Sequence, residues 1–308
     1  MVRELFRPLG SRLLRDARDT RIGDLGECPW SAIAGVPWDW NTGGDPGARH
    51  APRQIIERLL SLPDHRPGLD GIGCKPRILG DIAVSGGDWA TTRERLRRAA
   101  SRVFDEYTFS LFVGGDHSIT GPILEALLEK GSVGLLMLDA HYDLRSVEEG
   151  VTSGSWLWDT AMIARKRLDA RLEAAIIGVA DFANPAYLEE RARRLGFRVV
   201  PARGVSRSGI EAALEAVDWL ASQAVERYYV TIDMDHVAEA YAPGVNSPSP
   251  LGLHPSASLE IVEYAMEKLR PIGADIVEVV PIKDVRGRTV RLASMIGATL
   301  LWGAKRWR

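Results

Sequence analysis

The chain has 308 residues, of which 45% are apolar and 26% are charged, and its formal net charge is −2. This length is enough to bury a substantial core, and the composition excludes disordered, collagen-like and coiled-coil chains. Because the arginines are scattered and basic residues are not in excess, we expect no nucleic-acid partner.

Short apolar runs alternate with longer amphipathic segments along the chain. The runs predict buried strands at 31–36, 109–113, 134–138, 175–179, 228–232 and 276–280. The amphipathic segments predict helices at 91–104, 121–130, 185–195, 210–224, 257–269 and 289–301. The alternation continues without a composition break. It predicts an α/β fold in which residues 1–308 form a single three-layer α/β/α domain around a mainly parallel sheet.

Cysteine content and the amino terminus bear on the cellular compartment. Cys28 and Cys74 are too few for a disulfide framework, so we expect two separate reduced thiols. Residues 1–8 lack the apolar core of a signal peptide, and no stretch reaches the apolar length of a membrane span. We therefore expect a cytoplasmic protein with no membrane partner.

Polar residues directly after the apolar runs are the first candidates for chemistry, because ligands of open parallel sheets bind at the carboxyl ends of the strands. Gly114, Gly115, Asp116 and His117 follow the run that ends at Val113. The glycines allow a tight turn from which His117 would project. Taken alone, this motif also fits a hydrogen-bonded structural Asp–His pair.

A second run leads into Asp139, His141 and Asp143, which would face the same side if the backbone stayed extended. Burying two carboxylates and an imidazole without compensation is costly, and a divalent cation supplies that compensation directly. A solvated strand end with chance alternation is the alternative interpretation.

A third run delivers Asp233 and Asp235, again two carboxylates on one face. The three strand ends together offer four carboxylates and two imidazoles, which suit two borderline-hard divalent ions. The absence of thiolates from this set argues against a structural zinc site.

These motifs resemble the ureohydrolase family of arginases, agmatinases and formimidoylglutamases. Its motifs Gly-Gly-Asp-His, Asp-Ala-His-Xaa-Asp and Asp-Xaa-Asp followed by Ala-Pro-Gly occur here in order, the last of them as Ala242-Pro243-Gly244. The similarity extends to residues 35–39 near the start and 275–281 near the end. It implies an arginase-like fold, two Mn²⁺ ions per subunit and a homo-oligomer, either a trimer or a hexamer.

The resemblance also implies residue roles. Asp139 and Asp233 would bridge the ions, Asp235 would also orient the attacking water, and Glu278 would grip a planar amidinium. A salt bridge is the alternative role for Glu278. The implied ligands are His117, Asp139, Asp143 and Asp233 for one ion, and Asp139, His141, Asp233 and Asp235 for the other.

The loop after the second motif departs from relatives that act on arginine or agmatine, because it lacks their histidine. It is similar to the loop of formimidoylglutamases, in which Arg145, Thr152 and Ser153 would bind a substrate carboxylate. We also expect Trp156 to help enclose the substrate.

The resemblance favours a binuclear manganese hydrolase that cleaves a C–N bond in a linear amidine or guanidine by means of a metal-bridging hydroxide. N-formimidoyl-L-glutamate is the favoured substrate, ahead of agmatine or a guanidino acid, because Arg145 would repel the agmatine dication. The alternatives are a deacetylase-like or phosphoester-cleaving metallohydrolase, and a metal-binding homologue without turnover.

Overall fold

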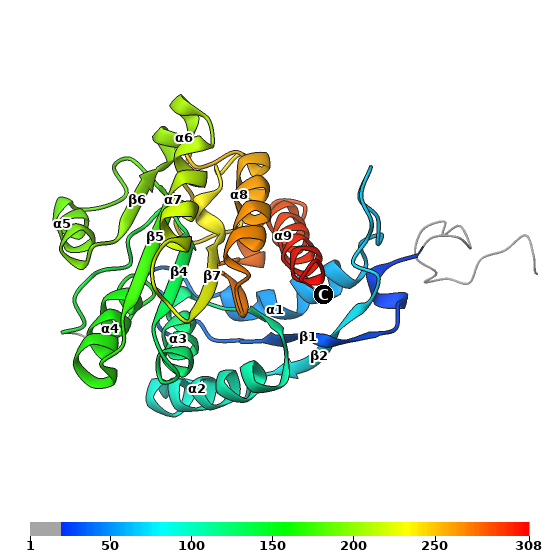
Figure 1. Cartoon of the computed structure of the whole chain (residues 1–308), viewed down its shortest axis with the longest axis horizontal. Coiled ribbons are helices and arrows are strands. Elements are labelled where there is room, and N and C mark those ends of the chain that lie inside the picture. The colour runs from blue at the N-terminus through cyan, green and yellow to red at the C-terminus, as the bar shows by residue number, and fades with distance from the viewer. Residues whose placement is uncertain (1–19, 149, 308) are drawn as a thin grey trace, which may run out of the picture.

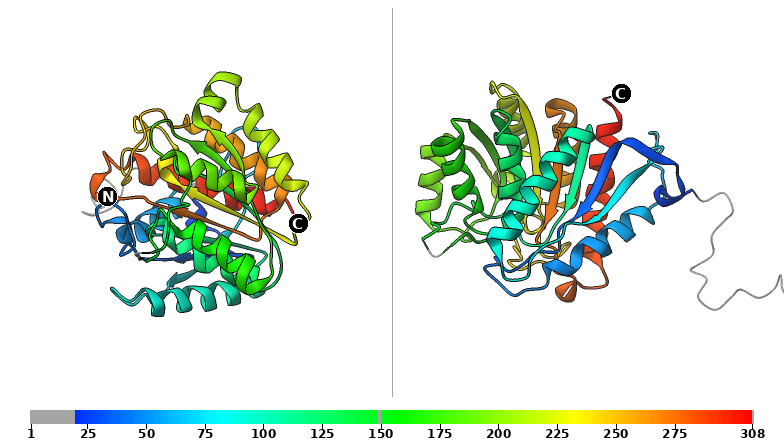
Figure 2. Two further views of the ribbon diagram at one scale, coloured as in Figure 1. Left: turned by 90° about the vertical axis from the view of Figure 1, so that its left-hand side faces the viewer. Right: turned by 90° about the horizontal axis from the view of Figure 1, so that it is seen from below.

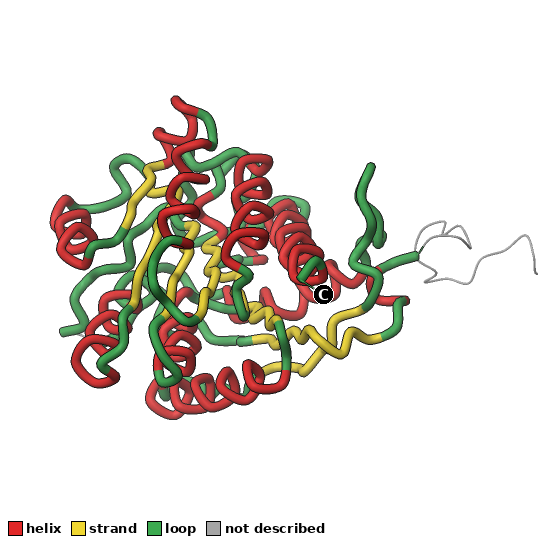
Figure 3. Tube along the Cα trace, viewed as in Figure 1, coloured by secondary structure: helices red, strands yellow, loops and turns green. Residues whose placement is uncertain are grey.

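The computed structural model describes residues 20–148 and 150–307, so the amino-terminal segment considered above lies outside the described residues. At its centre is one sheet, whose strands are yellow in Figure 3. All paired strands are parallel, and the strand order is β2-β1-β3-β8-β7-β4-β5-β6. The strands are β1 Glu27–Gly35, β2 Lys75–Asp81, β3 Phe109–Val113, β4 Val133–Leu138, β5 Leu172–Val179, β6 Arg198–Pro201, β7 Arg227–Asp233 and β8 Gly273–Val277.

Helices cover both faces of the sheet (Figures 1 and 2). Helices α1, α6, α7, α8 and α9 contribute to one core, and α2, α3, α4 and α5 contribute to the other. The three-layer prediction is therefore confirmed. The helices of the described residues are α1 Ala51–Leu60, α2 Trp89–Glu106, α3 Thr120–Leu128, α4 Trp156–Ile163, α5 Ala186–Leu195, α6 Ala202–Ser208, α7 Glu211–Ala221, α8 Pro255–Leu269 and α9 Arg288–Lys305.

Burial on both faces explains why the strands read as continuous apolar runs. In β4, Leu136 and Leu138 pack into one core, whereas Leu135 and Met137 pack into the other. Side chains of a strand alternate between the two faces, so a strand covered on both sides must be apolar at every position. The central strands were therefore visible in the sequence.

The two edge strands, β2 and β6, were missed by the sequence analysis. Strand β2 is largely exposed and contains a proline, and β6 has only four residues. A proline is tolerated on an edge strand because one side of its backbone is unpaired. Strand β8 also ends at Val277, three residues earlier than predicted, and this places Glu278 beyond the strand.

Helices α1, α4 and α6 were missed as well. Helix α4 follows the loop motif directly, and most of its residues are apolar, so it lacks the polar face that marks a surface helix. No helix of the described residues is both long enough and apolar enough to span a membrane.

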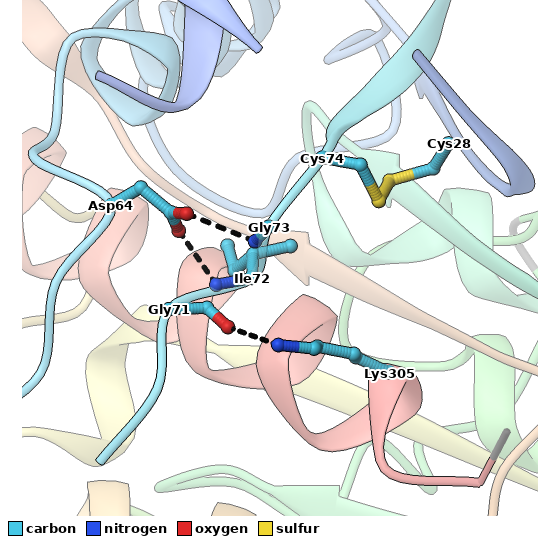
Figure 4. Close-up of a disulfide and its surroundings, with 7 residues drawn as sticks. All are labelled: Cys28, Asp64, Gly71, Ile72, Gly73, Cys74 and Lys305. Carbon is cyan, nitrogen blue, oxygen red and sulfur yellow. Dashed lines mark hydrogen bonds between the residues drawn. A yellow bond between two sulfur atoms is a disulfide. The ribbon is translucent and has the colours of Figure 1, made fainter. Parts of the chain in front are cut away.

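The expectation of two separate thiols is wrong, because Cys28 and Cys74 form a disulfide (Figure 4). Cys28 lies in β1, and Cys74 directly precedes β2, where Glu27 pairs with Lys75. The parallel pairing of these strands brings together two cysteines that are 46 positions apart. The number of cysteines in the sequence could not reveal this contact.

Replacing both cysteines with serine should lower the free energy of unfolding by about 2–4 kcal/mol, because the disulfide restricts the unfolded chain. Urea denaturation followed by circular dichroism measures this change. The wild-type protein under reducing conditions should match the double variant. Equal unfolding midpoints for the oxidised wild type and the variant would contradict the expectation.

Candidate metal centre

The four central strands end at one edge of the sheet and supply the predicted site residues. Strands β3, β8, β7 and β4 are consecutive neighbours. They lead into His117, Glu278, Asp233 and the loop that starts at Asp139. Segments far apart in sequence therefore converge because their strands are adjacent in the sheet.

Imidazole and carboxylate atoms approach one another closely at this edge. Nδ1 of His117 lies 3.0 Å from Oδ2 of Asp139, 3.0 Å from Oδ2 of Asp143 and 3.2 Å from Oδ2 of Asp233. Nδ1 of His141 lies 2.9 Å from an oxygen of Asp235. These atoms form two groups that could each hold a metal ion, and Asp139 belongs to both: His117, Asp139 and Asp233 form the first, and Asp139, His141 and Asp235 form the second.

The acidic motifs reach this arrangement through turns and not through an extended strand, which corrects the sequence-based geometry. Oδ1 of Asp139 accepts the N–H of His141 at 2.6 Å, and Oδ1 of Asp233 accepts the N–H of Asp235 at 2.9 Å. Each first aspartate thus folds the next two residues back toward itself, as aspartates do in turns. One carboxylate oxygen of each remains available for a ligand.

Asp143 has a left-handed backbone with φ of 51°, which is uncommon for a residue other than glycine. Its Oδ2 accepts a hydrogen bond from Nε1 of Trp156 at 2.7 Å. The ring of Trp156 is fully buried and lies 4.8 Å from the ring of His117. Trp156 does not line the pocket, so the expectation that it encloses substrate is corrected: it lies behind His117 and Asp143 and holds the Asp143 carboxylate in position.

Two buried atoms at the centre have no hydrogen-bond partner among the described residues. They are Nδ1 of His117 and Oδ2 of Asp139, which face each other. An unpaired polar atom in a protein interior is costly, and coordination to a cation removes that cost. Carboxylates and imidazoles without thiolates suit divalent ions such as Mn²⁺, so these residues fit the implied metal.

The pKa values of the buried groups also indicate that this centre has more negative charge than its side chains can compensate. Burial, together with neighbouring carboxylates, raises the pKa of Asp139 to about 6 and raises the pKa of Asp233 well above its ordinary value. Burial opposes protonation of the two histidines, but the surrounding carboxylates raise the pKa of His141 to about 12 and that of His117 well above its ordinary value. Protons thus compensate the carboxylates of the metal-free centre, and metal binding should release them.

Glu278 lies beside the metal-binding groups. Its backbone has φ of 62°, which turns it away from the line of β8. Oε1 accepts the N–H of His117 at 2.8 Å, and Oε2 accepts a longer bond from Asn246 at 3.4 Å. Burial, followed by the charge of Asp116, raises the pKa of Glu278 to about 8. Among the described residues no lysine or arginine forms an ion pair with Glu278, which argues against the structural salt bridge.

A pocket of about 260 Å³ opens above these groups. Its lining includes His141 and Glu278 as well as Arg145, Thr152 and Ser153 from the loop between β4 and α4. Backbone hydrogen bonds hold this loop in place: within the loop, Arg145 N–H donates to the Gly154 carbonyl, and Ser153 N–H donates to the carbonyl of Asn41 in the loop after β1. The predicted carboxylate-binding residues and the metal-binding groups therefore line one cavity.

A sequence-family model for the arginase family matches residues 31–302. The chain belongs to the arginase family. Members of this family are hydrolases that act on C–N bonds of amidines and guanidines, and this chain is therefore a hydrolase of that class.

Several arginase-family relatives are similar over most of their length. A formimidoylglutamase of Halobacterium salinarum is 33% identical and covers 94% of this chain and 96% of its own. The human mitochondrial guanidino acid hydrolase is 32% identical, covering 86% of this chain and 75% of its own. The crystal structure of Trypanosoma cruzi formiminoglutamase with Mn²⁺ superposes with a TM-score of 0.81 at 22% identity, covering 93% of this chain and 99% of its own, and so shares the fold.

Sequence reasoning about this arginase-family site missed several residues that line the pocket. Thr42, Gly43 and Gly44 come from the loop after β1, and Asn184 and Leu188 come from the region at the start of α5. For the loop after β1 the sequence signal was the resemblance at the adjoining residues 35–39, whereas no motif marked Asn184 or Leu188. His236 adjoins Asp235 but is buried against Ser258, with Nε2 2.7 Å from its hydroxyl, so it contributes no ligand atom to the two groups.

Proposed function

We propose that the chain is a binuclear manganese enzyme that hydrolyses N-formimidoyl-L-glutamate to L-glutamate and formamide. The single observation that carries the choice of substrate is the position of Arg145. It lines the same pocket as the metal-binding groups and Glu278, and it makes no ion pair with any described residue. Its charge is thus available to a substrate carboxylate.

Two divalent ions, when bound, supply a water acidic enough to attack at neutral pH. The residues of the chain then have separate tasks. The carboxylate of Glu278 matches a planar amidinium in charge and shape. Asp235 accepts the Ala140 N–H at 3.1 Å through Oδ1, and its other oxygen faces His141, where it would accept a hydrogen bond from the attacking water.

The carboxylate end of the substrate would bind at the loop. Arg145 offers a guanidinium fork, and the side chains of Thr152 and Ser153 offer hydroxyl groups. A substrate with an amidine at one end and carboxylates at the other therefore matches the charge pattern of the cavity. The sequence similarity of this chain to formimidoylglutamases supports the same substrate.

Manganese and two ions per chain are supported by the donor set and by the shared fold of the trypanosomal formiminoglutamase, whose crystal structure contains Mn²⁺. A closed homo-oligomer, trimer or hexamer, and a cytoplasmic location remain predictions.

Agmatine is the main alternative substrate. It is a dication without a carboxylate, so the free charge of Arg145 should oppose its binding. A guanidino acid is a second alternative, and it would satisfy both Glu278 and Arg145. Because the chain is similar to the human guanidino acid hydrolase, the experiment below includes a guanidino acid as a substrate.

A metal-binding homologue without turnover is less well supported, since all six implied ligand positions hold carboxylates or imidazoles that converge. A single-zinc deacetylase or a phosphoesterase is also disfavoured, because among the described residues only His117 and His141 supply imidazoles to the pocket lining, and two overlapping groups of residues could each hold an ion.

The deciding experiment measures hydrolysis of formimidoylglutamate, agmatine, arginine and guanidinobutyrate by manganese-loaded protein. Formamide release from the first compound is the expected result, with no comparable urea release from the others. Preferential urea release would replace the proposed substrate and retain the class of enzyme. Tight metal binding without turnover of any of the four would support the homologue without activity.

Replacing Arg145 with alanine should raise KM for formimidoylglutamate about 10- to 100-fold with little change in kcat, because hydrogen bonds to a charged group contribute about 1.5–3 kcal/mol. Agmatine turnover should stay the same or improve. Steady-state kinetics with both substrates measure the change.

Arg53→Ala is the matched control, because Arg53 lies in α1 with its side chain 84% exposed, and within the described part of the chain its one ion pair is with Glu57 of the same helix. It should leave both substrates unaffected. An Arg145→Ala variant that improves agmatine turnover without impairing formimidoylglutamate hydrolysis would reverse the ranking of substrates.

A further inference from the structure

A chain of hydrogen bonds runs from His117 into the interior, away from the pocket. Nε2 of His117 lies 2.8 Å from the Thr231 hydroxyl, which lies 2.5 Å from Oδ1 of Asp275. Both Thr231 and Asp275 are fully buried, and neither lines the pocket. They come from the adjacent central strands β7 and β8, where Thr231 and Asp275 are paired.

Asp275 is surrounded by hydroxyl donors. Its Oδ2 accepts hydrogen bonds from Thr120 at 2.9 Å and from Tyr229 at 3.0 Å, and Oδ1 accepts the bond from Thr231. No lysine or arginine of the described residues forms an ion pair with this carboxylate. Three hydroxyl hydrogens thus satisfy a buried acceptor.

The direction of these bonds determines which nitrogen of His117 faces the metal groups. A carboxylate only accepts, so the single hydroxyl hydrogen of Thr231 is donated to Asp275. The Thr231 oxygen can then only accept from Nε2–H of His117. In the neutral imidazole, which is the form that binds a metal, Nδ1 therefore carries the lone pair, and Nδ1 is the atom that approaches Asp139, Asp143 and Asp233. In the metal-free centre Nδ1 carries the proton that metal binding would release.

The second histidine of the centre has no equivalent support. His141 is 26% exposed in its side chain, and among the described residues no side chain is hydrogen-bonded to its Nε2. The two metal-binding groups therefore differ in their histidines: Nε2 of His117 is hydrogen-bonded to a buried side chain, and Nε2 of His141 is not, among the described residues.

We propose that Thr231 and Asp275 are positioning residues of the metal centre, which hold His117 in the metal-binding tautomer and selectively set the affinity of the ion that His117 binds. The inference rests on the two-ion centre proposed above. It adds a prediction that the two ions depend differently on residues outside the coordination sphere.

Thr231→Val tests this inference, because valine keeps the shape of threonine and removes the hydroxyl, and Thr231→Ser restores the hydroxyl. Manganese binding is measured by equilibrium titration with electron paramagnetic resonance, which separates isolated ions from coupled pairs. We expect Thr231→Val to weaken one ion about 10- to 100-fold and leave the other unchanged, so that isolated ions appear before pairs. Thr231→Ser should bind both ions like the wild type.

Ser258→Ala is a matched control, because it removes a buried hydroxyl that contacts a histidine outside the two metal-binding groups. It should leave both affinities unchanged. If Thr231→Val does not fold, Asp275→Asn is tested by the same manganese titration. We expect it to weaken the binding of one ion and leave the other unchanged.

Unchanged affinities in Thr231→Val, equal weakening of both ions, or an equal loss in Thr231→Ser would overturn the inference. A wild-type chain that binds fewer than two ions would overturn both the proposed centre and this inference. A wild-type chain with two ions but no selective loss in the variants would overturn this inference alone.

Discussion

Replacing Asp139 with asparagine should abolish binding of a metal pair and reduce kcat/KM by about 10³-fold or more, the equivalent of several kcal/mol of transition-state stabilisation. Asp139 is the one residue that belongs to both metal-binding groups, and it is fully buried between His117 and His141. Asparagine keeps the size of the side chain, but it removes the negative charge that two cations would share.

Metal analysis after gel filtration and steady-state kinetics measure this effect. Manganese should also raise the melting temperature of the wild type and not that of the variant, because a ligand stabilises only a fold that binds it. Asp105→Asn is the matched control, since Asp105 lies in α2 with its side chain 69% exposed. A pair of ions retained in Asp139→Asn would contradict the bridging role.

Replacing Glu278 with glutamine should reduce kcat/KM for the preferred amidine about 10²- to 10⁴-fold while both metal ions remain bound. Two charge-assisted hydrogen bonds to an amidinium, at about 1.5–3 kcal/mol each, account for this range. Glutamine keeps an oxygen that can accept the N–H of His117, so the loop that carries this ligand should stay in place.

Metal content separates this variant from Asp139→Asn, because Glu278 is not a member of either metal-binding group. Glu267→Gln is the matched control, as Glu267 lies in α8 with its side chain 60% exposed. If Glu278→Gln lost metal together with activity, Glu278 would be a support of the centre and not a substrate-binding residue.

The expected effects of Asp139→Asn and Glu278→Gln differ because the two residues have separate roles, one in metal binding and the other in substrate binding. Asp139 belongs to the two metal-binding groups beneath the pocket. Glu278 and Arg145 line the space where a substrate with opposite charges at its two ends would lie. Changes to the implied metal ligands should alter metal content, whereas changes to Glu278 or Arg145 should alter kinetics alone.

The sequence by itself determined the central part of the fold. Strands β3, β4, β5 and β7 were predicted because both faces of the sheet are covered and every position must be apolar. The edge strands β2 and β6 were not, since an edge strand buries less and leaves a weaker pattern.

The same holds for the candidate site. The candidate imidazole and carboxylate ligands were predicted from their motifs, because several charges buried at one strand end need a cation to compensate them. Only the order of the strands decided that His117, Asp139 and Asp233 meet, since adjacency in a sheet is a contact between distant segments.

Tertiary structure also decided the features with no local pattern. The disulfide of Cys28 and Cys74 depends on the pairing of β1 with β2, and the turns at Asp139 and Asp233 replace the extended backbone that alternation had suggested. Trp156 became a support of Asp143 because helix α4 packs behind the metal-binding groups. Local sequence records which side chains can be buried or can bind metal, whereas packing between distant segments decides which of them meet.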